Sequence, residues 1–279
     1  MKDSTKGIIN RIIDFSAVDG PGNRTVIFFQ GCNFNCSYCH NPETINFCNH
    51  CGLCAEHCPS RALEFTNKQI RWTPDACTDC NICQQMCPNE ASPKTRVYTP
   101  PELLNAVQRN LPFISGITIS GGECTLQYDF LTEFLSLAKA HGISTFIDTN
   151  GHLHPDKMKK LSSLFDKAML DIKAFGESKH RKLTGASPDY VLANAEYLLQ
   201  NNKLYEIRSP VAEGLDNKNT IDKASRLIAS HNPDLRYKII AYRTAGVRKP
   251  EVLKPPSARL IKTLTETACN NGCRNVISV

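Results

Sequence analysis

Cysteine is the reactive residue type that stands out in this sequence. Fourteen of the 279 residues are cysteines, and eleven of these lie between Cys32 and Cys87. Thiolate sulfur is a soft ligand that suits zinc and iron–sulfur clusters. The N-terminal residues contain no continuous apolar segment of a secretion signal, so we expect metal ligands rather than a disulfide framework. The other three, Cys124, Cys269 and Cys273, are expected to be reduced thiols.

Eight of the cysteines form two copies of one motif. Each copy has the pattern Cys-x2-Cys-x2-Cys-x3-Cys-Pro, and the second follows the first at an offset of 29 residues. This is the spacing of a bacterial two-cluster ferredoxin, in which three cysteines of a run bind one [4Fe–4S] cluster and the fourth binds the other. The predicted ligand sets are Cys48, Cys51, Cys54 and Cys87 for one cluster, and Cys58, Cys77, Cys80 and Cys83 for the other. The alternative is a pair of zinc knuckles, because CxxC pairs also bind zinc.

Cys32, Cys36 and Cys39 form a separate group that follows a strand-like segment at residues 25–30. Three thiolates can ligate three irons of a cluster and leave the fourth iron open. An open coordination position is typical of a catalytic metal site, whereas structural sites are closed. Because the eight cysteines downstream already form two ligand sets, we expect a third [4Fe–4S] cluster here, with one open iron.

Apolar segments of strand length and amphipathic segments of helix length alternate through most of the chain. The expected strands are residues 25–30, 116–120, 144–149, 167–172, 204–211 and 236–242, with a final one at 275–279. The expected helices are residues 101–110, 128–141, 155–165, 188–200 and 220–230. This alternation predicts an α/β fold, a partial (β/α)6 TIM-like barrel whose parallel sheet is closed or nearly closed.

Polar motifs follow the carboxyl ends of several expected strands. They are Gly31-Cys32 and residues 120–123 (SGGE), 148–151 (DTNG) and 171–173 (DIK). Since the loops after the strands build the site in such barrels, one functional face is expected. Residues 47–95 break the pattern, because they are rich in cysteine and proline and poor in apolar residues. We expect residues 1–46 and 96–279 to form the barrel domain, and residues 47–95 to be a ferredoxin-like insert that metal stabilises.

The composition excludes several classes of protein. Hydrophobic residues at 41% and charged residues at 22% allow a packed core, which excludes gross disorder. No apolar segment approaches the roughly 18 residues that span a membrane, so no membrane association is expected. The net charge of +6 is too small and too dispersed to indicate nucleic-acid binding. Many thiols without a signal predict the reducing cytoplasm.

A series of motifs, taken together, resembles a known family. Residues 18–22 (VDGPG), 28–32 (FFQGC) and 38–42 (YCHNP) precede the SGGE and DTNG motifs and residues 169–173 (MLDIK). With the Cx3CxYC spacing of Cys32, Cys36 and Cys39, the series is similar to the glycyl-radical-enzyme activating family of the radical S-adenosylmethionine (SAM) superfamily, to which pyruvate formate-lyase activase belongs. The pattern is most similar to the YjjW-type activases, and it covers the chain from Gly7 onward.

The resemblance implies a reaction and its partners. The open iron would bind SAM, one electron would cleave its sulfonium, and a 5′-deoxyadenosyl radical would remove hydrogen from a glycine of a partner glycyl radical enzyme under anaerobic conditions. Flavodoxin or ferredoxin would donate the electron. The two insert clusters would relay electrons or form a docking surface.

The resemblance also implies which residues bind the cosubstrate. The catalytic residues would be Cys32, Cys36, Cys39 and Lys173, with Lys173 pairing with the carboxylate of SAM. Tyr38, Cys39 and His40 would present backbone and an aromatic surface to the adenine.

Two glycines and two longer side chains extend this set. Gly121 and Gly122 would let the backbone approach the methionine amino group, with Gly122 in direct contact. Glu123 would support that loop. Arg243 occupies the position where a histidine usually contacts the cosubstrate, and it would bond the ribose or the carboxylate.

A monovalent cation, sodium or potassium, is also implied by the resemblance. Its ligands would be Asp148, Thr149, Asp171 and the backbone of Ile172, and Asp171 would bracket the cosubstrate together with Lys173. For Asp148 the alternative is a turn residue at a strand end. Arg208, near the end of an expected strand, would reach the cosubstrate or pair with an acidic neighbour.

Two other functions remain open at this point. The first is a radical SAM enzyme that acts on a small molecule or a peptide, against which the VDGPG segment argues. The second is a ferredoxin-like electron carrier fused to a barrel, which would leave the Cys32, Cys36 and Cys39 spacing unexplained.

Overall fold

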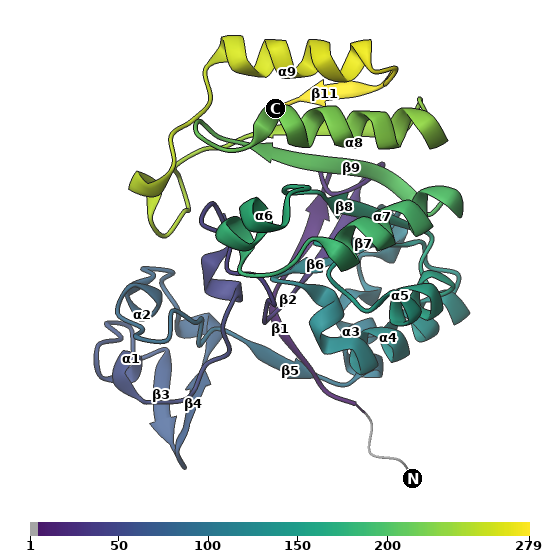
Figure 1. Ribbon diagram of the computed structural model, residues 1–279. Helices are drawn as coiled ribbons and strands as arrows, with labels where there is room; N and C mark the ends of the chain where they lie inside the picture. The colour runs from purple at the N-terminus through teal and green to yellow at the C-terminus, as the bar shows by residue number, and fades with distance from the viewer. Residues whose placement is uncertain (1–4) are drawn as a thin grey trace.

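The computed structural model describes residues 5–279, and within them nine strands form one sheet (Figure 1). The order of the strands across the sheet is β11-β10-β9-β8-β7-β6-β2-β1-β5. The strands are β1 Gly7–Ser16, β2 Arg24–Phe29, β5 Arg96–Tyr98, β6 Gly116–Gly121, β7 Thr145–Thr149, β8 Lys167–Asp171, β9 Leu204–Val211, β10 Arg236–Ala241 and β11 Val276–Ser278. In this spatial order, all neighbouring strands from β11 across to β2 pair in parallel. Strand β1 pairs antiparallel with both β2 and β5.

Helices cover the outer face of this sheet. They are α3 Pro100–Gln108, α4 Tyr128–Ala140, α5 Pro155–Ser162, α6 Glu177–Thr184, α7 Asp189–Gln200, α8 Asn217–His231 and α9 Ala258–Asn270. Alternate side chains of each strand face the helices, so β2, β6 and β7 bury Ile27, Ile119 and Ile147 completely in a common core. The opposite face of the strands carries the polar residues of the site. None of the helices within residues 5–279 has the length and apolar character that crossing a membrane requires.

The α/β class and the mostly parallel sheet agree with the sequence prediction. Every expected strand and helix is present, with bounds that differ by no more than three residues. Of the two expected forms of the sheet, full closure is excluded, because in the described residues the sheet ends in two edges, β5 and β11. The mostly parallel sheet is consistent with the expected partial barrel. Strands β1 and β5 and helices α6 and α9 were not predicted.

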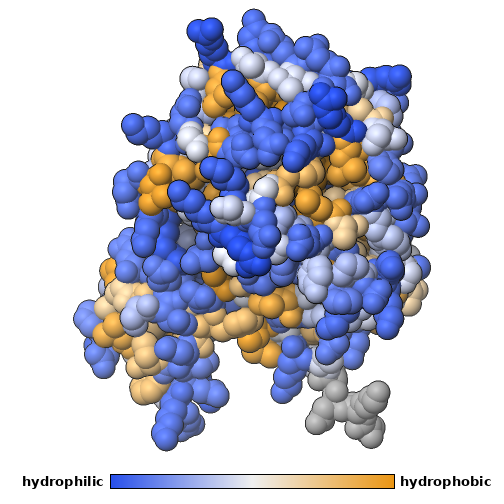
Figure 2. All heavy atoms as spheres, in the orientation of Figure 1, coloured by the Kyte–Doolittle hydropathy of each residue, from blue (hydrophilic) through white to orange (hydrophobic). Residues whose placement is uncertain are grey.

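Residues 47–95 form a small lobe beside the barrel, at the lower left of Figure 1. Its elements are α1 Leu53–Glu56, β3 Leu63–Thr66, β4 Gln69–Trp72 and α2 Ile82–Gln85. Cys54, Leu63, Ile70 and Cys83 make up its buried core. Hydrophobic side chains also reach its surface (Figure 2), among them Phe65, which is 49% exposed. So few buried side chains are a weak core for a lobe of this length.

The backbone of this lobe repeats with the same offset as its cysteines. Gly52 and Asn81 both have positive φ, at 90° and 60°, and each precedes the short helix of its run. His50 and Asp79 form a second such pair, and Arg61 and Glu90 a third. Residues other than glycine and asparagine rarely adopt this conformation. The duplicated sequence therefore folds into two loops of the same shape.

Candidate active site

A cavity of about 220 Å³ lies at the carboxyl ends of the parallel strands. Five chain segments contribute to its wall, namely the loop after β2 and the ends of β6, β7, β8 and β9, together with one residue of β10. Most of the predicted site residues line it: Cys32, Cys36, Tyr38, Cys39, His40, Gly121, Gly122, Asp148, Asp171 and Lys173. The structure thus brings together residues that are far apart in the sequence.

The loop that carries the three cysteines is fixed from two sides. The amide of Cys32 donates to the carbonyl of Ile45 at 2.9 Å, and the amide of Asn35 donates to the carbonyl of Thr184, the last residue of α6, at 2.8 Å. Helix α6 therefore holds the loop from outside the sheet.

The three cysteines are half-buried, in surroundings that suit metal ligands. Burial raises the pKa of Cys32 to about 12 and that of Cys36 to about 11, while the charge of Lys173 opposes the rise at Cys36. A metal supplies the positive charge that a buried thiolate needs. Within residues 5–279 no three His, Cys, Asp or Glu side chains converge on the position of a single ion. Each thiol of a [4Fe–4S] cluster binds a different iron, so three sulfurs around one cavity fit a cluster.

Gly121 and Gly122 are required by close packing between the loops after β2 and β6. A Cβ atom on Gly121 would lie 2.2 Å from the carbonyl oxygen of Phe29, and one on Gly122 would lie 2.3 Å from that of Gly31. The amide of Gly122 donates to Phe29 at 3.0 Å. The predicted contact of Gly122 with ligand stays a prediction, and the packing is a second reason for glycine at both positions.

Glu123 is buried and ties the loop after β6 to the loop after β7. Its Oε1 accepts from the amide of Thr125 at 3.0 Å, the hydroxyl of Thr125 at 2.6 Å and the hydroxyl of Thr149 at 2.8 Å. Its Oε2 accepts from the amide of Asn150 at 2.7 Å. Glu123 does not line the cavity, so its part is to hold the loops.

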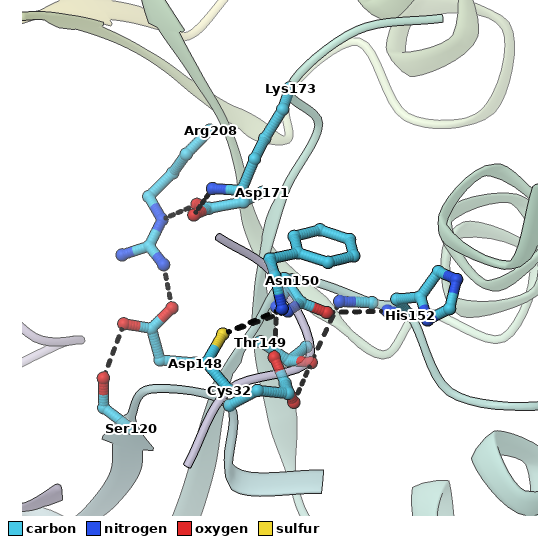
Figure 3. Close-up of polar contacts among 12 residues, drawn as sticks. Cys32, Ser120, Asp148, Thr149, Asn150, His152, Asp171, Lys173 and Arg208 are labelled. Atoms are coloured by element: carbon cyan, nitrogen blue, oxygen red, sulfur yellow. Dashed lines mark hydrogen bonds and ion pairs between the residues drawn. The ribbon is translucent and has the colours of Figure 1, made fainter. Parts of the chain in front are cut away.

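Two carboxylates and two cations alternate across the cavity (Figure 3). The guanidinium of Arg208 bonds Asp148 through Nη2 and Asp171 through Nε, the latter at 2.8 Å. Lys173 donates to the second oxygen of Asp171 at 2.9 Å, and Ser120 donates to Asp148 at 3.0 Å. Burial alone would lower the pKa of Lys173, but Asp171 and other neighbours raise it well above its ordinary value. The four charges cancel, and all four side chains point into the site.

Arg208 is the main site residue that the sequence left undecided. It pairs with Asp148 and Asp171, lies 3.9 Å from Glu206, and also lines the cavity. The available signal was a pair of charged residues, Glu206 and Arg208, at alternate positions of one expected strand, which places both on the same side of the sheet.

The predicted ligands of a monovalent cation lie partly in the cavity. Asp148, Thr149 and Asp171 line it, whereas Ile172 does not. The guanidinium of Arg208 bonds both carboxylates, and the hydroxyl of Thr149 donates to Glu123. A cation on these residues stays a prediction.

Arg243 does not reach the site, contrary to the prediction. It is exposed, lies beyond the end of β10 and is absent from the cavity wall. In β10 the even-numbered positions face the interior, and Ile240 lines the cavity instead. The adjacent Tyr242 is buried, with its ring centre 6.2 Å from that of His40.

Asn150 contacts the cysteine loop directly, which the sequence did not reveal. Its Nδ2 lies 3.9 Å from the sulfur of Cys32 and donates to Asn33 Oδ1 at 2.8 Å (Figure 3). Asn33 in turn donates to the carbonyl of His152 at 3.0 Å. The DTNG segment therefore supports the cysteine loop as well as the cavity wall.

The cysteines of the lobe are grouped as the spacing predicts for one ligand set. Cys58, Cys77, Cys80 and Cys83 line one small cavity with Lys94 and Trp72. For the other set, burial raises the pKa of Cys48, and the charges of Cys87 and Cys51 add to the rise, so these thiols are neighbours. Cys58 therefore lies with the first three cysteines of the second run, and Cys87 lies near Cys48; the two ligand sets stay a prediction.

Arg248 connects the lobe with the cysteine loop of the barrel. Its guanidinium bonds the carboxylate of Glu90 and donates to the carbonyl of Pro42 at 2.9 Å. Arg248 and Glu90 line a cavity that contains Cys87 and another that contains Cys36 and Cys39. The Cys87 side of the lobe is thus the side next to the site.

Comparison with known proteins relates the chain to one superfamily. The sequence model of the Radical SAM superfamily matches residues 26–207. A choline trimethylamine-lyase activating enzyme from Oleidesulfovibrio alaskensis is 31% identical over 268 residues, covering 88% of this chain and 86% of that protein. A pyruvate formate-lyase-activating enzyme from Streptococcus mutans is 32% identical over 254 residues, covering 88% and 80%.

A solved structure shares the fold. QueE from Escherichia coli superposes with a TM-score of 0.55 over 98% of this chain and 94% of that one, at 15% sequence identity. This likeness concerns the α/β fold alone.

Proposed function

Because the chain belongs to the radical SAM superfamily and, within it, to the activating enzymes of glycyl radical enzymes, we propose that its cavity binds SAM beside a [4Fe–4S] cluster on Cys32, Cys36 and Cys39. The enzyme is an oxidoreductase that activates a partner enzyme through a glycine of that partner. When bound by Cys32, Cys36 and Cys39, a cluster would supply the electron for reductive cleavage of SAM, the chemistry that leads to removal of hydrogen from the glycine. The observation that carries the proposal is a cavity that joins three half-buried thiols to polar groups from the strand ends.

The polar groups of the cavity suit the charges of SAM. Lys173 and Arg208 are cations that can pair with its carboxylate, and Asp148 and Asp171 can accept from its amino group or its ribose hydroxyls. Within the described residues the hydroxyl of Tyr38 is buried and has no hydrogen-bond partner. A buried hydroxyl without a partner is costly, and a ligand in the cavity would supply one.

We further propose that the lobe of residues 47–95 is a ferredoxin-like domain with two more [4Fe–4S] clusters, which brings the total to three. The grouping of Cys58 with Cys77, Cys80 and Cys83 supports this, as does the repeated loop shape. Zinc is the competing metal, and metal analysis distinguishes the two. A reduced flavodoxin or ferredoxin would donate electrons to these clusters, and the reducing cytoplasm is the compartment that suits so many free thiols.

The position of Arg248 supports a relay from the lobe to the site. Arg248 and Glu90 border both the Cys87 cavity and the cavity of Cys36 and Cys39. The cluster on Cys48, Cys51, Cys54 and Cys87 would therefore be the one nearer to the site.

The test is anaerobic reconstitution with iron and sulfide of the wild type and of a variant with Cys32, Cys36 and Cys39 all changed to alanine. Three clusters correspond to about twelve irons per chain, and the variant should retain about eight. A matched control is Cys269→Ala, because Cys269 is exposed and belongs to none of the ligand sets. The control should keep about twelve irons and should form 5′-deoxyadenosine from SAM when reduced.

Each result has a distinct meaning. If the wild type holds about eight irons and the triple variant loses none, the three cysteines bind no cluster and the proposed site is wrong. If the wild type holds about four irons and the triple variant none, the barrel site stands and the lobe holds no clusters. Zinc in place of iron in the lobe would support the zinc knuckles.

A further inference from the structure

Lys94 places a nearly buried ammonium group against one of the two cysteine sets of the lobe. It lines the same small cavity as Cys58, Cys77, Cys80 and Cys83, and its side chain is 12% exposed. Its Nζ donates to Asp79 Oδ1 at 2.9 Å and lies 3.3 Å from Asn81 Oδ1. Both acceptors belong to the loop between Cys77 and Cys83, so the loop holds the ammonium in place.

The first cysteine run cannot hold a lysine in the same way. By the offset of 29 residues, His50 and Gly52 correspond to Asp79 and Asn81, and each pair shares its backbone conformation. Gly52 has no side chain to accept a hydrogen bond. The ring of His50 accepts from the amide of Ile70 at 3.1 Å, so it is already engaged. Two loops of one shape therefore differ in the charge that they carry.

The charge of Lys94 is offset only in part by its partner. Asp79 Oδ1 lies 3.6 Å from the sulfur of Cys77, but Asp79 is 83% exposed, so water screens its carboxylate. Lys94 is 12% exposed and lines the cavity together with the four cysteines, so its charge is screened less.

We propose that Lys94 raises the reduction potential of the cluster on Cys58, Cys77, Cys80 and Cys83 above that of its neighbour in the lobe. The inference rests on the proposed function, because it requires the lobe to hold two iron–sulfur clusters. Reduction adds one negative charge to a cluster, and a nearby cation stabilises that charge. The cluster beside Lys94 is the one farther from the site, since Cys87 belongs to the other set. An electron that enters the lobe therefore rests on the far cluster until the site draws it through the near one.

The test is a redox titration of the reconstituted full-length enzyme with dithionite, followed by electron paramagnetic resonance. Each step transfers one electron from the titrant to a cluster, and no bond or proton moves. Lys94→Gln should lower the potential of one lobe cluster, with a change on the order of tenfold in the equilibrium constant for reduction, about 59 mV for one electron. The potentials of the other two clusters should stay unchanged. Lys94→Arg should retain the wild-type value, because it keeps the charge.

Two further variants identify the effect. Lys68→Gln removes an exposed lysine from the turn between β3 and β4 of the same lobe, and it should shift no potential. In Cys80→Ser, the signal that Lys94→Gln shifts should be the one that is lost. The inference is overturned if Lys94→Gln leaves every potential unchanged, or if both lobe clusters shift together with a loss of iron, which would indicate a structural role. A wild type with only about four irons would overturn the lobe part of the proposed function first, and this inference with it.

Discussion

Replacing Glu123 by glutamine tests the claim that this side chain holds two loops of the site together. Glu123 is 1% exposed, and its carboxylate accepts four hydrogen bonds from nitrogen and oxygen donors, three on Oε1 and one on Oε2. The thiol of Cys124 makes a longer contact with Oε1 at 3.9 Å. Glutamine has one acceptor oxygen. If that oxygen takes the Oε1 position and keeps its donors, the side-chain NH2 of the glutamine takes the Oε2 position. It then faces the backbone N–H of Asn150, and two donors meet. The variant therefore keeps the shape of the side chain and removes one acceptor together with the charge.

The size of the effect follows from those contacts. One buried N–H group without a partner costs about 1–3 kcal/mol, and loss of the charge weakens the three remaining bonds, so we expect destabilisation of about 2–4 kcal/mol. For a chain of this length 1 kcal/mol corresponds to about 2 °C, so the melting temperature should fall by about 4–8 °C. Anaerobic scanning calorimetry of the reconstituted protein measures this shift.

The control is Glu133→Gln, which changes the same residue type at an exposed position, where it accepts from Thr5 at 2.7 Å. We expect a shift of no more than about 1 °C there. Thr149→Val should cost less in the Glu123→Gln background than in the wild type, since the two residues share a hydrogen bond. A shift in Glu123→Gln no larger than the control, or full additivity with Thr149→Val, would refute the reasoning.

Three other substitutions test separate parts of the site. Gly122→Ala places a methyl group 2.3 Å and 2.7 Å from the carbonyl oxygens of Gly31 and Thr44, so we expect the free energy of unfolding in urea to fall by about 1–3 kcal/mol. The control is Gly176→Ala, which should be neutral because the nearest neighbour of its methyl group lies at 3.8 Å. Equal effects at the two glycines would contradict the packing argument. Arg208→Met leaves Asp148 and Asp171 with Lys173 as their one remaining cation. Because the two carboxylate side chains are 18% and 25% exposed, water limits the loss of stability to about 1–3 kcal/mol. SAM should also bind more weakly to this variant in equilibrium dialysis. Unchanged binding would remove Arg208 from the cosubstrate site. Burial lowers the pKa of His180, so the unfolded chain takes up a proton at a higher pH than the folded chain does, and stability should fall as the pH drops below about 6.5. In urea unfolding, His180→Gln should lose less stability between pH 7.5 and pH 6.0 than the wild type does. An equal loss of stability in the two proteins would contradict this role of His180.

The sequence predicted the parallel strands well because each is a short, strongly apolar segment. Strand β2, for example, is buried at every position. Strand β1 was missed because its outer half alternates between half-buried and exposed positions, and charged residues interrupt its isoleucines. Helix α6 was missed because it is mostly polar and buries only His180, Leu183 and Thr184. Helix α9 carries the helical spacing of Leu260, Ile261, Leu264 and Ala268, and this signal was overlooked.

Site residues were predictable where a motif lies at the end of a strand. They were less predictable where membership of the site depends on which side of the sheet the side chain faces. Asp148 lies near the end of β7, Cys32 and Lys173 lie shortly after β2 and β8, and all three line the cavity. Arg208 and Arg243 both lie near strand ends, yet one faces the interior and the other is exposed. A shift of one residue reverses the side of a sheet on which a side chain lies, and spacing alone does not reveal that parity.

The lobe leaves the barrel and returns to it at a single point. Asn46 and Ala91 pair as neighbouring strands do, and Asn46 and Asn89 are joined by a further hydrogen bond of 3.0 Å. Two adjacent ends make the lobe an exchangeable module, because a short peptide bridge could replace it without moving β2 or β5. The entropy of closing the loop grows only slowly with its length, so the barrel tolerates a long excursion there nearly as well as a short one. Lobes of other lengths could thus be accommodated at these two ends while the barrel and its cavity stay the same.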